Sequence, residues 1–189
     1  EFLKTNFAIT KVELANQIAD TLRSKDNFYI SDLTKKESRK NPYPPFITSS
    51  LQVEASRKLR FRPRRTMMLA QQLYEGIDLG AEGTTGLITY MRTDSTRLSE
   101  DVVSEARNFI NEKYGGQYLP EKPKTYEQKN KKNVQDAHEA VRPTSLKYTP
   151  EFVKEFLDEA QFKLYELIWK RFIACQMESS RLETTTDSI

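Results

Sequence analysis

The sequence predicts a mainly α-helical protein with short β elements, an α+β fold. Several stretches carry apolar residues at helical spacing, as Leu14, Ile18 and Leu22 do, and shorter β-prone runs lie between them. A helix, a basic turn, a second helix and a glycine-spaced loop follow one another between residues 46 and 86. This is the order of a winged helix-turn-helix. The length of 189 residues suffices for one ordinary core, or for one domain with pieces of another.

The first 45 residues are expected to form a strand, a helix and a second strand. Residues 1–9 have the character of a strand, and a capping box opens a helix over 11–24. Apolar residues alternate imperfectly over 28–33, which predicts a strand running into a basic stretch. Three prolines over 41–45 cannot continue a helix or a central strand, so they mark a domain boundary.

Helices dominate the middle of the chain. One is predicted to open within Phe46–Gln52, with Thr48 or Ser49 as its N-cap, and to run to about Leu59. After a basic turn a second helix carries the apolar residues from Met67 to Tyr74. Glycines then space a loop into a short predicted strand over 87–91.

The later part of the chain returns to helix and ends in a strand. Ser99 caps a helix that a glycine pair ends, and the polar, lysine-rich residues 120–134 predict an exposed loop. Thr149, followed by proline, opens a helical stretch that is expected to break near Ala160. The threonine-rich tail over 179–189 predicts a strand that pairs with the opening strands.

Composition excludes several classes of protein. Hydrophobic residues make up 37% and charged residues 30%, and no apolar run approaches the length of a membrane span. One cysteine, Cys175, excludes a disulfide framework and a cysteine-based zinc site. No P-loop motif is present, and no cluster of acidic residues offers a magnesium site. We therefore expect a protein of a reducing cytoplasm that hydrolyses no nucleotide and binds no metal through these residues.

Positive charge is concentrated in one zone. From Lys35 to Arg65 ten basic residues stand against two acidic ones, although the net charge of the whole chain is only +3. Arginine predominates and helical pattern follows at once, which favours a nucleic acid as the partner. The alternative is a solvated basic surface.

The stretch 86–95 carries the strongest catalytic pattern. Period-2 alternation places Ile88, Tyr90 and Arg92 on one face of a strand and Thr89 and Met91 on the other. The guanidinium would bind a phosphate oxygen, offset negative charge during attack by the phenol, and favour the phenolate. Thr93 and Ser95 add hydroxyl donors. The alternatives are a tyrosine packed in a core and an arginine in a surface ion pair.

His138 and Arg142 form a second candidate pair. They lie four residues apart, on one side of the chain if this stretch is helical, and both can donate hydrogen bonds to a phosphate. His138 is the only histidine, so a metal site with two histidine ligands is excluded for this chain. Its alternative role is that of a hydrogen-bonded loop residue.

Four blocks of sequence resemble motifs of the bacterial type IA DNA topoisomerases. They stand in the family's order: Pro45–Gln52, Arg65–Met68 with Gln71, Leu73, Tyr74 and Glu75, Gly86–Ser95, and Ala137–Thr144. The resemblance covers most of the chain and is weakest before Pro44.

The resemblance implies a nucleophile and its helpers. In that family a tyrosine attacks a phosphodiester in single-stranded DNA, which forms a 5′-phosphotyrosyl link and leaves a free 3′-hydroxyl; the matching residue is Tyr90. Arg92 would position the phosphate and His138 would support it. Since one phosphodiester is traded for another, resealing needs no ATP. The further residues expected at DNA are Arg142, Thr93, Ser95, Thr48, Ser49, Gln52, Arg62, Arg64 and Arg65.

The family's Toprim domain, with its acidic Mg²⁺ site, has no counterpart in this sequence. Since the chain also begins without methionine, we expect an excised piece that cleaves no DNA alone, and Mg²⁺ only in the intact enzyme. Residues 45–176 would be the tyrosine-bearing helical domain. Residues 1–44 would be part of a β-rich arch, or gate, and 177–189 a strand returning to it. We expect a monomer, both as this piece and as the intact enzyme, in the bacterial cytoplasm at the nucleoid.

Two other functions fit parts of the sequence. One is a winged-helix DNA-binding module without catalysis, in which Tyr90 only packs or stacks. The other is an architectural hinge whose basic zone is a solvated face. If Tyr90→Phe abolishes activity and DNA binding is retained, the protein is the enzyme rather than the non-catalytic module. The salt dependence of DNA binding tests the architectural hinge, because contacts to phosphates make binding weaken steeply with salt.

Overall fold

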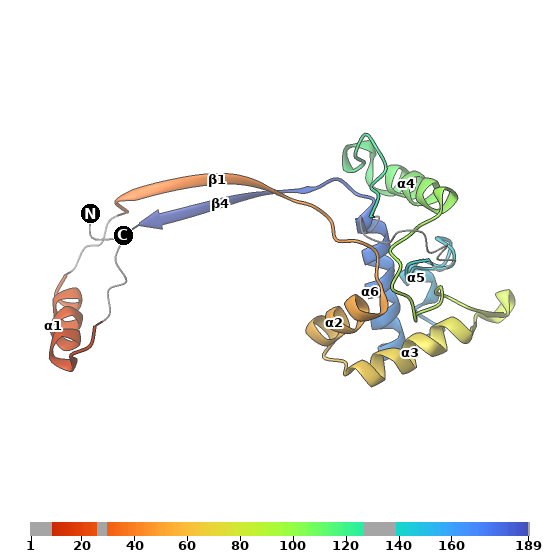
Figure 1. Ribbon diagram of the computed structural model, residues 1–189, viewed down its shortest axis with the longest axis horizontal. Coiled ribbons are helices and arrows are strands. Elements are labelled where there is room, and N and C mark those ends of the chain that lie inside the picture. The colour runs from red at the N-terminus through yellow and green to blue at the C-terminus, as the bar shows by residue number, and fades with distance from the viewer. Residues whose placement is uncertain (1–8, 26–29, 127–138, 189) are drawn as a thin grey trace. The chain divides into compact units, whose positions relative to one another are not determined.

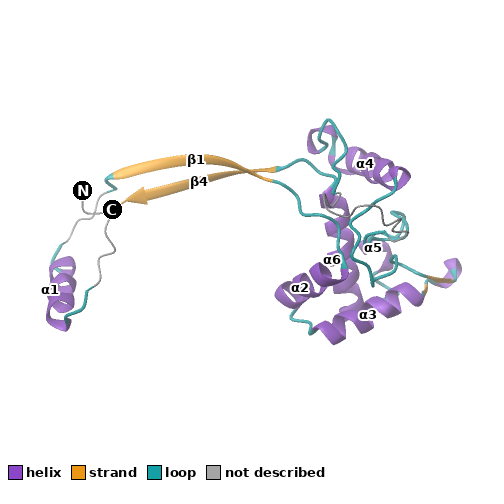
Figure 2. Ribbon diagram, in the orientation of Figure 1, coloured by secondary structure: helices purple, strands orange, loops and turns teal. Residues whose placement is uncertain are grey.

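The computed structural model describes residues 9–25, 30–126 and 139–188 (Figure 1). Helices and short strands are mixed along the chain (Figure 2), which confirms the predicted combination of helix and strand. The chain divides into two compact units. One comprises Glu1–Ser38 with Arg181–Ile189, and the other comprises Arg39–Ser180.

The first unit contains one helix and most of a strand pair. Helix α1 spans Val12–Arg23, close to the predicted 11–24. The two-stranded sheet is formed by β1, Asp32–Lys40, and β4, Ser180–Ser188, so the predicted pairing of the tail with an early strand is present. Strand β1 is exposed at every position. It begins at Asp32 and runs into the basic stretch, as predicted, whereas Phe28 of the predicted strand lies outside the described residues.

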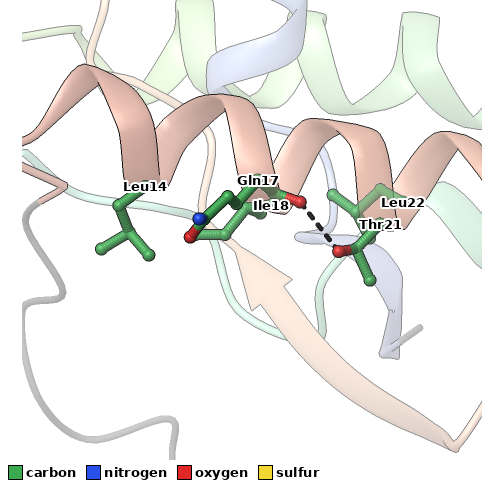
Figure 3. Close-up of a pocket in the computed structure, with 5 residues that line it drawn as sticks. All are labelled: Leu14, Gln17, Ile18, Thr21 and Leu22. Carbon is green, nitrogen blue, oxygen red and sulfur yellow. Dashed lines mark hydrogen bonds between the residues drawn. The ribbon is translucent and has the colours of Figure 1, made fainter.

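Helix α1 has an apolar face that no described residue buries. Leu14, Ile18 and Leu22 line a shallow pocket together with Gln17 and Thr21, as Figure 3 shows. The Thr21 hydroxyl donates to the carbonyl of Gln17 at 2.8 Å. All five residues belong to the helix itself, and none of its residues is buried.

The second unit is a helical domain built around α6, Glu159–Cys175. Helices α2, Thr48–Leu59, α3, Pro63–Glu75, and α5, Pro150–Val153, all contact α6. The buried side chains of α6 are Leu164, Tyr165, Ile168, Trp169, Phe172, Ile173 and Cys175. Their spacing is that of one broad helical face. A further helix, α4, spans Glu100–Tyr114.

Local signals explain most helix ends. Pro63 occupies the first turn of α3, and Gly115, at φ 102°, ends α4. Thr149 accepts a hydrogen bond from Phe152 N–H at 3.3 Å, as expected for the N-cap of α5. The predicted cap of α2 is wrong by one residue. Ile47 is the N-cap, and its N–H donates to Ser50 Oγ at 3.0 Å; the Thr48 side chain is engaged elsewhere.

Short elements connect the helices. Strands β2, Ile77–Asp78, and β3, Thr84–Thr85, form an antiparallel hairpin around a 3₁₀ turn, η1, Gly80–Glu82. A second 3₁₀ turn, η2, spans Gly116–Tyr118.

The strand predicted over 87–91 is not formed. Only one isolated bridge pairs Ile88 with Pro143. The ladder does not extend past this bridge because the N–H groups that would continue it have other acceptors. Leu87 N–H donates to Leu73 O, and Arg142 N–H donates to Thr89 Oγ1. The chain then bends at Met91 and Arg92.

Candidate functional site

The four sequence blocks converge through backbone hydrogen bonds. Val141 N–H donates to Phe46 O at 2.8 Å, which joins the last block to the first. Thr144 N–H donates to Leu87 O at 3.0 Å, which joins it to the tyrosine block. Leu87 N–H donates to Leu73 O at 2.7 Å, at the end of α3. Residues far apart in sequence therefore form one framework around the tyrosine.

Tyr90 lies on the solvent side of this framework. The residue is 40% exposed, whereas Ile88 and Met91 are almost fully buried. From Tyr90 to Asp94 exposed and buried residues alternate, so that Arg92 is exposed and Thr93 buried. Tyr90 and Arg92 are thus both exposed, but Ile88, which was predicted on the same face, is buried. The single strand face that was predicted is wrong, because no regular strand is formed here.

Thr89 anchors the chain on the N-terminal side of Tyr90. Its hydroxyl donates to Ala140 O at 2.7 Å and accepts from Arg142 N–H at 3.0 Å. Its own N–H donates to Arg142 O at 2.9 Å. Three hydrogen bonds thus tie the residue before the tyrosine to the 140–142 segment.

Thr48 anchors the chain on the C-terminal side of Tyr90. Its Oγ1 lies 2.8 Å from Met91 O and 3.0 Å from Thr93 O, and it accepts from Thr93 N–H at 2.9 Å. The N–H of Thr48 also donates to Thr93 O at 2.9 Å. The first turn of α2 is therefore hydrogen-bonded to Met91 and Thr93, the two residues that flank Arg92.

The C-terminal turn of α3 supports the tyrosine from another direction. The rings of Tyr74 and Tyr90 meet edge to face, with centroids 5.4 Å apart and planes at 63°. Gly86 lies so close that a Cβ there would stand 2.6 Å from Tyr74 O. The glycine thus permits the tyrosine block to approach this helix end.

The predicted phosphate-binding residues are arranged in different ways. Thr93 Oγ1 accepts from Ser95 N–H at 3.0 Å, and Ser95 Oγ accepts from Arg97 N–H at 3.2 Å, so both hydroxyls take part in local turns. Arg142 Nη2 lies 2.6 Å from Glu139 Oε2, and Nη1 donates to Pro143 O at 2.8 Å. Their roles at phosphate stay predictions.

The helical arrangement considered for His138 and Arg142 is not present in the described part of this stretch. Val141 and Pro143 form isolated bridges in extended chain. His138 itself lies outside the described residues.

A basic turn joins α2 to α3. Arg62 is its last residue, and Arg64 and Arg65 lie in the first turn of α3; all three are exposed. The guanidinium of Arg65 stands 4.7 Å from the centre of the Phe61 ring. Ser49 is exposed and Gln52 half-buried on α2. These five were predicted at DNA together with Thr48, and this too stays a prediction.

A buried amide ties a loop to the end of α6. Gln176 is fully buried, and its side chain accepts from Lys124 N–H at 3.2 Å and donates to Lys124 O at 2.9 Å. Tyr126 Oη donates to Cys175 O at 2.7 Å, and burial raises the pKa of Tyr126 to about 12. Because Thr96 Oγ1 donates to Tyr126 O at 2.6 Å, this loop also touches the end of the tyrosine block.

Neither a metal site nor a spanning helix is found in the parts that the structure describes. No three histidine, cysteine or acidic side chains among residues 9–25, 30–126 and 139–188 are grouped to hold an ion. These residues therefore do not fit a metal centre, and no chemical step is assigned to a metal held by them. None of the described helices is long and apolar enough to cross a membrane.

Comparison with known proteins identifies the family. The family model described as DNA topoisomerase matches residues 2–189. The chain belongs to the DNA topoisomerase family. It is 54% identical over 173 residues to the DNA topoisomerase 1 of Rickettsia bellii (strain RML369-C), which is 92% of this chain and 21% of that protein. It is 50% identical over 183 residues to that of Rickettsia felis (strain ATCC VR-1525 / URRWXCal2), 97% of this chain and 23% of that protein.

A solved topoisomerase structure has the same arrangement. Full-length topoisomerase I from Thermotoga maritima matches 99% of this chain with 39% identity and a TM-score of 0.75, and the match covers 28% of that protein. The prediction that the chain is a segment of a bacterial type IA topoisomerase is confirmed. It spans about a fifth to a quarter of the length of the curated topoisomerases that it matches.

Sequence reasoning missed three supports of the tyrosine in this topoisomerase segment. Thr89 was placed only on the opposite strand face, Thr48 was assigned to DNA, and Tyr74 was only part of a motif. A hydroxyl residue directly before Tyr90 was the one available signal for Thr89. Nothing in local spacing shows that Thr48 or Tyr74 reaches the tyrosine block.

Proposed function

We propose that the intact protein relaxes negatively supercoiled DNA through Tyr90. The phenol oxygen attacks the phosphorus of a phosphodiester in single-stranded DNA, and the bond from phosphorus to the 3′ oxygen breaks. The 3′ oxygen leaves with a proton as a hydroxyl, while the 5′ phosphate stays on the tyrosine. After another strand passes through the gap, the reverse reaction reseals the DNA without ATP.

The observation that carries this proposal is the exposure of Tyr90 on a fixed backbone. A packed tyrosine would be buried with its neighbours, but here Met91 is fully buried while Tyr90 is 40% exposed. Hydrogen bonds from Thr89 and Thr48 hold the chain on both sides of it. A nucleophile needs this combination of access and fixed orientation. Arg92, exposed two residues on, supplies a cation for the phosphate.

The proposed scaffold for DNA is a winged-helix-like module. Helices α2 and α3 pack against each other and are joined by the basic turn, and the β2–β3 hairpin follows directly. In such modules the second helix lies on DNA and the hairpin lies beside it. Arg62, Arg64 and Arg65 would then contact phosphates, and the partner would be mainly single-stranded DNA.

The proposal extends to the organisation of the parent enzyme. Residues 45–176 would be the tyrosine-bearing domain, with 1–44 and 177–189 belonging to a gate. Mg²⁺ would be bound by a Toprim domain of the parent, which would act as a monomer at the bacterial nucleoid. The 189-residue chain alone would lack half of the cleft. Formation of a covalent DNA adduct by the isolated chain would contradict this part.

The Tyr90→Phe variant of the intact protein tests the proposed function. We expect loss of both the covalent adduct and relaxation, with the affinity for single-stranded DNA within about twofold of the parent. Tyr118→Phe is the matched control, because Tyr118 is 47% exposed and lies in η2 rather than in the tyrosine block. A large loss of binding with activity retained would favour a non-catalytic winged-helix module instead.

A further inference from the structure

The hydroxyl of Thr48 is fully occupied as a donor by the tyrosine block. A threonine hydroxyl has one proton and two lone pairs. Its proton is shared between Met91 O at 2.8 Å and Thr93 O at 3.0 Å, and one lone pair accepts from Thr93 N–H at 2.9 Å. An ionised phosphate accepts hydrogen bonds but donates none. Thr48 could therefore donate to a phosphate only by releasing these contacts.

The backbone of Thr48 adds a further hydrogen bond to Thr93. Its N–H is one of the first N–H groups of α2, which lack partners within the helix, and it donates to Thr93 O at 2.9 Å. The hydroxyl and the amide thus hold Thr93 through both its N–H and its carbonyl. This closed arrangement fixes both the position and the orientation of Thr93.

Fixing Met91 and Thr93 determines where their neighbours point. Both are buried, at 0% and 7% exposure, whereas Tyr90 and Arg92, on either side of Met91 in a bend of the chain, are exposed. Tyr90 and Arg92 are therefore turned outward together. A contact to Thr89 alone would fix the chain before the tyrosine but leave the arginine free to turn.

We propose that Thr48 is a positioning residue, which sets the relative placement of the Tyr90 phenol and the Arg92 guanidinium without touching DNA itself. The proposal rests on the proposed function of Tyr90. It gives Thr48 a role different from the DNA contact predicted from sequence. Since small misplacements of reacting groups lower rates steeply, loss of the hydroxyl acts on the chemical step rather than on binding.

The test uses the intact protein and a single-stranded oligonucleotide labelled at its 3′ end. After cleavage, the fragment that carries this label is the one joined to the tyrosine through its 5′ phosphate, so the adduct is labelled. Thr48→Val keeps the shape of the side chain and removes the hydroxyl. We expect a 10- to 100-fold slower single-turnover formation of adduct at saturating DNA, on the order of the loss caused by a misplaced reacting group. The DNA concentration at half-maximal rate should stay within about threefold of the parent. Thr48→Ser should restore the rate to within about threefold.

Controls separate this proposal from its alternatives. Ser56→Ala, at an exposed position of α2, should leave the rate unchanged. Parent-like cleavage by Thr48→Val, or weaker binding with an unchanged maximal rate, would overturn the positioning role; the second result would make Thr48 a DNA contact. If Tyr90→Phe still forms the adduct, or the parent protein forms none, the proposed function of Tyr90 has failed instead.

Hydrogen exchange of the unaltered protein covers the case in which Thr48→Val does not fold. The amide hydrogens of Thr48 and Thr93 should exchange more slowly than that of an unstructured peptide, because both are bonded in this arrangement. Exchange of either amide at the free-peptide rate would overturn the proposal without any variant.

Discussion

Helices α6 and α1 belong to different units, and they use their apolar faces in opposite ways. Both have apolar residues at helical spacing, yet α6 buries seven side chains and α1 buries none. Leu164 on α6 is fully buried, whereas Leu22 on α1 is 50% exposed. An amphipathic pattern therefore determines that a helix forms and which face is apolar, but it does not supply the partner.

The same contrast separates the strand pair from the helical unit. Strand β1 is exposed throughout, while the helical unit contains a continuous core that includes Phe46, Leu73 and Phe172. The residues that position the tyrosine are all in the unit that has this core. A rigid framework under an exposed reactive group requires such packing.

A matched pair of leucine variants should give the largest difference. Leu164→Ala removes a fully buried side chain and leaves a cavity, so the free energy of unfolding should fall by about 2–5 kcal/mol. Leu22→Ala should change it by no more than about 0.5 kcal/mol. Urea unfolding followed by the fluorescence of Trp169, which lies in α6, measures both. Equal losses would contradict the difference in burial between Leu164 and Leu22.

Arg171 is a charged side chain of α6 that is largely buried, and it can be compared with an exposed charge of the same helix. Its guanidinium lies 4.2 Å from the centre of the Phe46 ring, donates to Pro44 O at 3.2 Å and stands 3.4 Å from Glu54. Burial lowers the pKa of Arg171.

Arg171→Ala should therefore lower the free energy of unfolding by about 2–3 kcal/mol, because it leaves a carboxylate and a carbonyl poorly paired. Lys170→Ala is the control, since Lys170 pairs with Glu166 in solvent, and it should cost less than about 0.5 kcal/mol. The same urea measurement applies. Arg171→Lys should rescue only part of the loss, because an ammonium cannot stack and pair at once. Full rescue would contradict the stacking.

The smallest expected effect is a dependence of stability on pH through Glu54. Its interaction with Lys58, whose Nζ lies 3.0 Å from Glu54 Oε2, is the main cause of a pKa below the ordinary 4.5. A lowered pKa in the folded state adds stability above pH 4.5, which is lost as the pH falls through the folded value.

Glu54→Gln should thus destabilise the protein at pH 7 by under about 1 kcal/mol, and this difference should shrink below pH 4.5. Urea midpoints of the parent and the variant at pH 7 and pH 3.5 measure it. Glu105→Gln, at an exposed position of α4, is the control. A difference that grows on acidification would show that the sign is wrong.

Much of the helical fold could be predicted because its signals are local. Prolines and caps explain where α3 and α5 begin, and a glycine explains where α4 ends. Two local predictions failed for non-local reasons. The strand at 87–91 is not formed because Leu87 N–H donates to Leu73 O in α3 instead of continuing the ladder. The cap of α2 shifts to Ile47, while the Thr48 hydroxyl bonds the tyrosine block.

By itself the sequence determined the family, the candidate nucleophile and the cation beside it, because the identity and spacing of residues within a motif are preserved in any conformation. Only the tertiary structure decided what holds them. Thr48, Tyr74 and Thr89 lie in three different segments, and they meet around Tyr90 through hydrogen bonds and ring contacts that depend on the packing of α2 and α3. Spacing along the chain contains no information about such contacts, since distant segments are brought together only when the common core forms.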